Sequence, residues 1–172
     1  MSSEINNLVK RAKNGSAEAF GELYEIYAKD MYRFAYYYLG SSAAAEDAVS
    51  ECVLLAFQKI GSLKKNSSFK TWIFKILRNC CNNALREKMK NINNVDIFSV
   101  QNLAADEKDE NEILSLRQAL DKLSDEEREI VILYYCAGYS SKEIGEIMGL
   151  KDSTVRSKIM RSGEKLRTYL QI

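Results

Sequence analysis

Basic and aromatic residues between positions 64 and 90 have types and spacing that suit unpaired nucleic acid. The stretch holds eight Lys or Arg residues against one acid, Glu87. At about 100° per residue, one face of a helix here is polar and cationic, and it consists of Thr71, Lys75, Arg78 and Asn82, with Phe74 at its edge. Cations bind phosphates, an amide bonds base edges, and aromatic rings stack on unpaired bases. The pattern favours single-stranded or melted DNA, and a solvated helix face is the plain alternative.

The opposite face of this helix is apolar, which predicts that it packs into a core. It consists of Phe69, Trp72, Ile73, Ile76, Leu77, Cys80 and Ala84. Trp72 lies at the border of the two faces. We interpret its indole first as a core anchor, and the alternative is a surface on which bases stack. Phe69 and Phe74 have the same two interpretations, and Phe69 is assigned to the core.

A second candidate site lies near the C-terminus, where the pattern is that of a DNA-reading helix-turn-helix. Ser124 and Ser140 each precede a Glu by three residues, so both pairs predict capping boxes. Gly149 makes a tight turn, and Asp152 or Ser153 caps the helix that follows. One face of that helix is basic and rich in hydroxyls, and it consists of Ser153, Arg156, Ser157, Met160 and Arg161.

The opposite face of this last helix is apolar from Val155 to Leu170, so it packs inward. Gly145 and Gly149 allow the two helices of the motif to approach closely. Arg156 and Arg161 can each pair with guanine or with phosphate. A plain three-helix bundle is the structural alternative to a DNA-reading motif.

Amphipathic helices in the first half must position the basic segment. Apolar residues recur every three or four positions from Ala19 to Tyr38, and Gly40 ends that helix. A second helix begins near Ala43 and stops at Gly61. Its outward residues near the N-terminus are Glu46, Asp47, Ser50 and Glu51. The acids either complement the helix dipole or form a protein-docking patch.

The net charge of +1 hides a strong asymmetry along the chain. Residues 1–90 carry 14 basic and 9 acidic side chains, a net charge of +5. Residues 91–129 carry 4 and 11, a net charge of −7, and residues 130–172 carry 7 and 4, a net charge of +3. The sequence therefore predicts an all-α protein of two small helical domains, residues 1–90 and 112–172, joined by a flexible acidic linker, residues 91–111.

Several classes of chemistry are excluded by composition. The chain contains no His, which removes serine triads, HExxH sites and imidazole relays. Its four Cys form no CxxC pair, so we expect reduced thiols and no metal or cofactor. No run of 18 apolar residues occurs, so we expect no membrane insertion. These features predict a cytoplasmic binding protein and not an enzyme.

Four segments match a known pattern in order: AEDAVSE at 45–51, SFKTWIFKILRN at 68–79, LSDEERE at 123–129 and SSKEIGEIMG at 140–149. Together they resemble an RNA polymerase sigma factor, and more narrowly the extracytoplasmic-function (ECF) group of the sigma-70 family. The resemblance covers roughly residues 5–90 and 112–170. It implies a transcription initiation factor that binds core RNA polymerase and directs it to promoters.

The first domain would then be sigma region 2. The resemblance implies that its second helix docks on the polymerase through Asp47, Ser50 and Glu51, although Ser50 stands where the family commonly has Gln. The loop 61–68 and the following helix would bind and help melt the −10 promoter element. The residues concerned are Lys64, Lys65, Asn66, Lys70, Thr71, Trp72, Lys75, Arg78, Asn79 and Asn82.

The second domain would be sigma region 4, a helix-turn-helix that reads the −35 element. The residues concerned are Ser153, Thr154, Arg156, Ser157, Met160 and Arg161. Core RNA polymerase and promoter DNA are the implied partners, and members of the family are often held by an anti-sigma factor. The alternative is a helix-turn-helix regulator that binds operator DNA without a sigma role. The strand-melting face argues against it, because an operator binder has no use for one.

Overall fold

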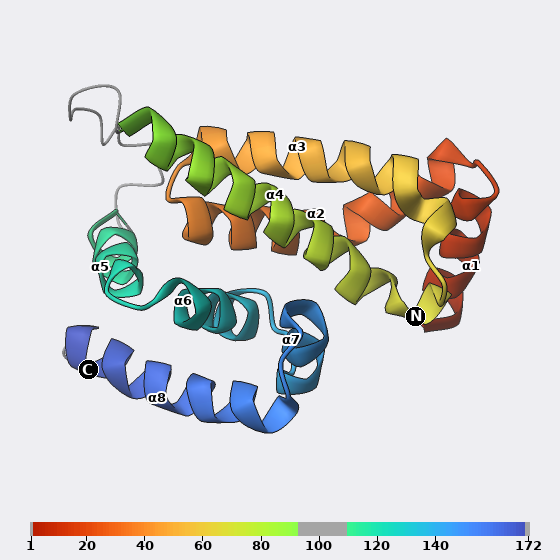
Figure 1. Cartoon of the computed structure of the whole chain (residues 1–172). Helices are drawn as coiled ribbons and strands as arrows, with labels where there is room; N and C mark the ends of the chain where they lie inside the picture. The colour runs from red at the N-terminus through yellow and green to blue at the C-terminus, as the bar shows by residue number, and fades with distance from the viewer. Residues whose placement is uncertain (1, 93–109, 171–172) are drawn as a thin grey trace.

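The computed structural model describes residues 2–92 and 110–170, and every structural statement below refers to them (Figure 1). They form eight α-helices: α1 Ser2–Lys13, α2 Ala17–Leu39, α3 Ser42–Lys59, α4 Phe69–Ile92, α5 Glu110–Asp121, α6 Asp125–Val131, α7 Ser141–Met148 and α8 Asp152–Leu170. Short 3-10 turns lie at Ile60–Ser62 and Asn66–Ser68, and a π-helical turn lies at Ile132–Cys136. The all-α class and the two helical domains are confirmed.

Residues 93–109, most of the predicted linker 91–111, lie outside the described residues. Helix α4 continues to Ile92, and α5 begins at Glu110. The exact domain boundaries therefore stay a prediction. None of the described helices is long and apolar enough to cross a membrane.

In the first domain, α2, α3 and α4 pack along their apolar faces. Ser16 caps α2 by accepting a hydrogen bond from the Ala19 amide, and Gly40 ends it at φ +70°. Ser41 caps α3 in the same way. Helix α1, which the sequence patterns did not predict, packs on α2 and buries Val9 and Ala12.

Two capping boxes organise the second domain, as predicted. The hydroxyls of Ser124 and Ser140 accept from the amides three residues on, and the Glu carboxylates there accept from the Ser amides. Gly149 ends α7 at φ +73°. The predicted cap of the last helix is wrong: Asp152 is already its first helical residue, where an acid complements the positive end of the helix dipole.

The two domains pack against each other, with α7 and the turn at 132–136 lying along α4 and α2, while α8 lies on the far side (Figure 1). This arrangement changes the environment of Phe74. Its ring is fully buried, with its centroid 4.6 Å from that of Tyr139. The core interpretation of Phe74 is therefore confirmed, and its place at the edge of an exposed stacking face is wrong, because a single helix period does not show that a second domain covers the polar side of α4.

Candidate nucleic-acid interface

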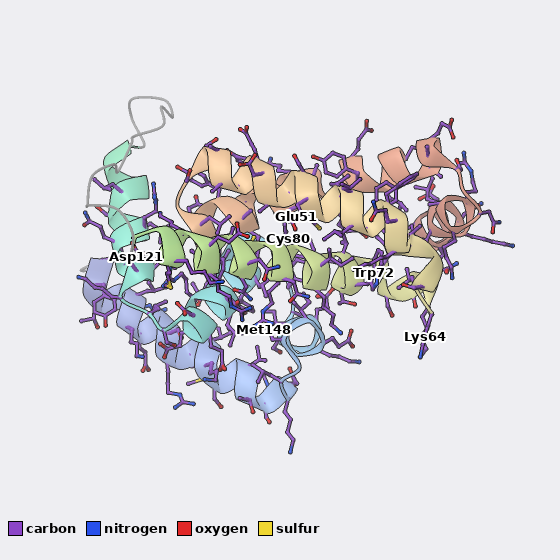
Figure 2. The ribbon with its side chains drawn as sticks, turned by 45° about the horizontal axis from the view of Figure 1, so that its top comes forward. Glu51, Lys64, Trp72, Cys80, Asp121 and Met148 are labelled. Atoms are coloured by element: carbon purple, nitrogen blue, oxygen red, sulfur yellow. The ribbon has the colours of Figure 1, made fainter. Side chains whose placement is uncertain are left out.

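A surface pocket of about 450 Å³ surrounds Trp72 at the N-terminal end of α4. Figure 2 shows Trp72 and Lys64 at the same end of the molecule. The pocket is lined by Ser62, Leu63, Lys64, Lys65, Ser68, Thr71, Trp72 and Lys75, together with Glu146 of α7. The indole is partly buried and touches Phe69, with ring centroids 5.8 Å apart. Trp72 therefore packs on the core and also lines a cationic pocket, and the stacking of bases on its indole stays a prediction.

Helix α1 holds the loop that forms one wall of this pocket. Lys13 Nζ donates to the Leu63 carbonyl at 2.7 Å and to Asn66 Oδ1 at 3.4 Å. Asn66 Nδ2 in turn donates to the Asn6 carbonyl at 3.4 Å. Asn66 thus serves to fix the loop, while Lys64 and Lys65 stay exposed. Sequence reasoning missed Lys13, because no local spacing links residues 50 positions apart.

Replacing Lys13 by Met is expected to loosen this loop. The substitution keeps the aliphatic stem and removes two hydrogen bonds from a charged donor, a loss of about 1 kcal/mol at a partly exposed site. Amide exchange at Leu63 and Ser68, which close the two 3-10 turns, should accelerate about fivefold. Lys10→Met, an exposed change on the same helix, is the control. Equal exchange in both variants would contradict the anchoring role.

On α4, some of the residues predicted to bind DNA have exposed side chains, and others are bonded within the protein. Lys75 and Asn79 are exposed. Lys70 Nζ lies 3.0 Å from Glu143 Oε1 and 4.0 Å from the centre of the Tyr139 ring. Thr71 is buried, and its hydroxyl donates to the Ser68 carbonyl at 3.1 Å.

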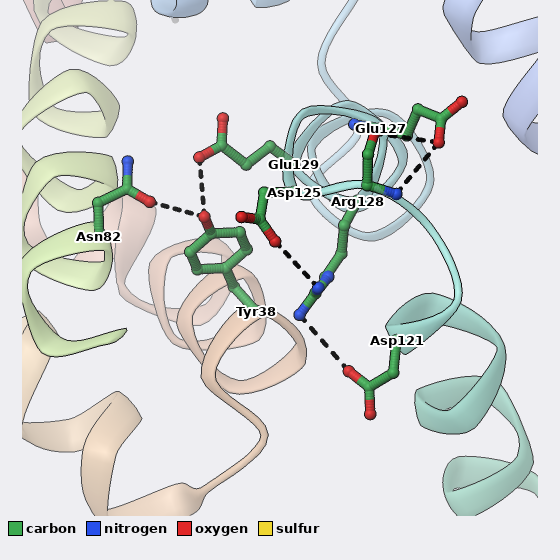
Figure 3. A network of polar contacts seen from close by, with 8 residues as sticks. Tyr38, Asn82, Asp121, Asp125, Glu127, Arg128 and Glu129 are labelled. Carbon is green, nitrogen blue, oxygen red and sulfur yellow. Dashed lines mark hydrogen bonds and ion pairs between the residues drawn. The ribbon is translucent and has the colours of Figure 1, made fainter. Parts of the chain in front are cut away.

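Arg78 and Asn82 belong to a polar network that joins the two domains. Arg78 Nε donates to Glu129 Oε2 at 2.7 Å, and the Glu129 side chain is only 3% exposed. The Tyr38 hydroxyl lies 2.6 Å from Asn82 Oδ1 and 3.0 Å from Glu129 Oε1 (Figure 3). Burial, followed by the charge of Glu129, raises the pKa of Tyr38. The hydroxyl therefore stays protonated and can act as a donor to these oxygens.

The proposed reading face of α8 is open to solvent. Val155, Ile159 and Ser162 are buried on its inner side, as predicted. All the predicted contact residues are exposed except Thr154, which is half-buried; the exposed ones are Ser153, Arg156, Ser157, Met160 and Arg161. Arg156 pairs with Asp152 one turn earlier at 3.2 Å. Such an exposed pair is weak, so the guanidinium is available to a stronger partner.

A close backbone approach holds α7 against the segment before α8. A Cβ added to Gly145 would lie 2.6 Å from the Leu150 carbonyl oxygen. The close approach expected between the two helices is thus found between Gly145 and the turn, while the Asp152 amide at the start of α8 would lie 3.7 Å from the added Cβ. Gly149 contributes its positive φ instead, and nothing lies within 4 Å of a Cβ placed there.

The predicted docking residues of α3, Asp47, Ser50 and Glu51, are all exposed (Figure 2 labels Glu51). Leu54 and Phe57 lie beside them with exposed fractions of 59% and 43%. Ser50, Leu54 and Phe57 follow the i, i+4, i+7 spacing of one helix face, so this spacing could have revealed the apolar part of the patch. Acidic side chains beside exposed apolar groups are typical of a protein-binding surface.

The four cysteines are free thiols. Cys52, Cys80 and Cys81 are buried and Cys136 is half-buried. Burial raises the pKa of Cys81, which keeps this thiol protonated and unreactive. Within residues 2–92 and 110–170, no group of three potential His, Cys, Asp or Glu ligands could hold a metal ion.

Comparison with known proteins matches both domains to one family. A family model described as Sigma-70 region 2 matches residues 23–91, and one described as Sigma-70, region 4 matches residues 113–166. The ECF RNA polymerase sigma factor SigW of Bacillus subtilis is 30% identical over 182 aligned positions, covering 97% of each chain. The ECF sigma factor BldN of Streptomyces coelicolor is 29% identical and covers 98% of this chain and 67% of its own.

Two solved structures have similar folds. The sigma factor RpoE of Bartonella quintana, in complex with the anti-sigma factor NepR, aligns with a TM-score of 0.78 at 26% identity and covers 91% of this chain and 99% of its own. CnrH in complex with the cytosolic domain of CnrY aligns with a TM-score of 0.81 at 21% identity, covering 98% and 97%. The second likeness concerns the fold alone.

Proposed function

Because this chain belongs to the ECF group of the sigma-70 family of RNA polymerase sigma factors, we propose that it directs core polymerase to promoters through three separate surfaces. The face of α8 reads the −35 element. The pocket around Trp72 and the exposed residues of α4 beside it, Lys75 and Asn79, bind the melted −10 element. The outer face of α3 docks on the polymerase.

The pocket around Trp72 is the observation that carries this proposal. It combines an aromatic face with Lys64, Lys65 and Lys75, the combination that an unpaired base and its flanking phosphates require. A base bound in this pocket has left the duplex. The free energy of its binding then offsets the cost of unstacking it, which is a few kcal/mol. A repressor that reads only duplex operator DNA gains nothing from such a pocket.

At the −35 element, Arg156 and Arg161 supply the groups that distinguish bases. A guanidinium can donate to both acceptors of a guanine edge, and each such pair discriminates by about 1–3 kcal/mol. Ser153, Thr154 and Ser157 lie within the first two turns of the helix, where hydroxyls can reach phosphates or bases. Met160, with 70% of its surface exposed, offers an apolar contact for a thymine methyl group.

On α3, Asp47, Ser50 and Glu51 supply polar contacts to core polymerase, and Leu54 and Phe57 supply the apolar centre. Chemistry is left to the polymerase, so the protein itself is non-catalytic, needs no cofactor and works in the cytoplasm. A solved relative is bound to an anti-sigma factor, which supports such a partner here as well.

Transcription from a randomised promoter library tests the proposal. Core polymerase, with and without the full-length protein, transcribes templates whose −35 and −10 segments are random, and the transcribed templates are sequenced. We expect enrichment of two short motifs at one preferred spacing, only when the protein is present. The rival regulator role predicts no transcription with core polymerase and a tight duplex complex without it.

A further inference from the structure

We infer that Asp152 is a positioning residue for Arg156: its carboxylate orients the guanidinium that reads a base of the −35 element. The inference rests on the proposed function, because it presupposes that the exposed face of α8 reads duplex DNA. Asp152 is not among the residues predicted to contact DNA. Its effect is on how strictly one base pair is distinguished, and not on the overall attraction to DNA.

Both oxygens of the Asp152 carboxylate have partners within the helix-turn-helix. The hydroxyl of Ser141, the first residue of α7, donates to Asp152 Oδ1 at 2.5 Å. Arg156 Nη2 lies 3.2 Å from Asp152 Oδ2, one turn further along α8. A single carboxylate therefore joins the start of α7 to the arginine, so the side chain of Arg156 is tied to both helices of the motif.

The backbone of Asp152 is also held close to α7. Its amide nitrogen would lie 3.7 Å from a Cβ added to Gly145, in the close approach between α7 and the turn. Asp152 is partly buried, whereas Arg156 is exposed. An ion pair between two mobile surface side chains restrains either of them little. Here the acid is fixed by a second helix, so the restraint is passed on to the arginine.

A restrained arginine is expected to distinguish bases better than a free one. A free arginine side chain populates many rotamers, and the loss of that freedom opposes binding. A guanidinium has five N–H donors and a guanine edge uses two, so Arg156 can pair with guanine and keep its contact with Asp152. Orientation by Asp152 thus lowers the entropic cost of reading the base.

The charge of Asp152 has the opposite effect on general attraction to DNA. A negative charge beside phosphates weakens binding to every sequence. Loss of this carboxylate should therefore lower discrimination between bases and strengthen sequence-independent binding. Damage to the fold of the motif would lower both. The two directions of change distinguish a positioning role from a structural one.

The test uses core polymerase, the full-length protein and promoter templates that differ at single base pairs of the −35 element. Discrimination is the ratio of run-off transcripts from the preferred and the substituted template in one reaction. The base pair read by Arg156 is the one at which Arg156→Ala lowers this ratio most. There, Asp152→Asn should lower the ratio about fivefold. On a template with a scrambled −35 element, Asp152→Asn should raise transcription about twofold.

Two further variants separate orientation from charge. Ser141→Ala removes the bond to Oδ1, keeps every charge and leaves the capping box of Ser140 intact. It should lower discrimination about twofold at the same base pair and leave transcription from the scrambled template unchanged. Glu164→Gln removes one negative charge from an exposed position of α8. It should raise transcription from the scrambled template as Asp152→Asn does, with discrimination unchanged.

The inference is overturned if Asp152→Asn keeps full discrimination at the base pair read by Arg156. It is equally overturned if Asp152→Asn lowers discrimination in the Arg156→Ala background as much as in wild type, because the acid then acts independently of the arginine. A loss of transcription on the intact and scrambled templates alike would show that Asp152 only supports the fold. The proposed function fails separately, if the wild-type protein directs no promoter-specific transcription with core polymerase.

Discussion

Replacing both Arg156 and Arg161 by Ala is expected to reduce transcription from a −35-dependent promoter by about 10- to 100-fold. Each guanidinium that pairs with a guanine contributes about 1–3 kcal/mol of discrimination, and both project from the exposed face of α8. Neither side chain supports the core, so the fold should be unchanged. The measurement is run-off transcription with core polymerase, on a template whose −35 element is intact and on one where it is scrambled.

On the scrambled template the double variant and wild type should give equally low transcription, because the two guanidinium groups find their matching bases only in the intact element. Lys122→Ala + Arg167→Ala removes the same charge from exposed positions of the second domain and should cost less than threefold on either template. An equal loss in both double variants would show that the arginines act only through general attraction to DNA.

Gly145→Ala is expected to destabilise the helix-turn-helix by about 2 kcal/mol. The new Cβ would lie 2.6 Å from the Leu150 carbonyl oxygen, a backbone atom that cannot move without shifting the start of α8. For a chain of this size the midpoint of thermal unfolding should fall by about 4–8 °C. Because α8 is displaced, recognition of the −35 element should also weaken in run-off transcription.

Gly163→Ala is the matched control and should change stability in the opposite direction. Its Cβ would meet only the Tyr135 hydroxyl, at 3.3 Å, on a side chain that is 60% exposed and able to turn away. Alanine in a helix interior then gains up to about 1 kcal/mol over glycine. A fall in the unfolding midpoint for both variants would contradict the close-approach explanation for Gly145.

Local sequence patterns were enough to predict most of the helices and the exposed face of α8 that is proposed to read DNA. Capping boxes at Ser124 and Ser140 and the glycines at 40 and 149 act within a few residues, so their effect is visible in the sequence. The inner face of α8 follows from one apolar period. The polar and apolar faces of α4 could also be predicted from the sequence, and Phe69, Ile73 and Leu77 are buried as expected.

Contacts between distant segments could not be predicted in this way. The burial of Phe74 and Thr71 and the pairing of Lys70 and Arg78 come from the second domain and the preceding turn, not from the period of α4. The hold of Lys13 on the loop at Leu63 is likewise a tertiary contact. A polar face in a sequence indicates a surface for water, for DNA or for another domain, and only the fold distinguishes these.

The most direct test of two separate DNA-reading surfaces compares two templates for one promoter, fully paired or with the −10 element already unpaired by mismatches. Lys75→Ala + Arg78→Ala should lower transcription about tenfold or more on the paired template and only a few-fold on the open one, because the cost of unpairing is then absent. Arg156→Ala + Arg161→Ala should lower transcription by the same factor on both templates. Identical losses of both double variants on both templates would contradict the assigned division of roles.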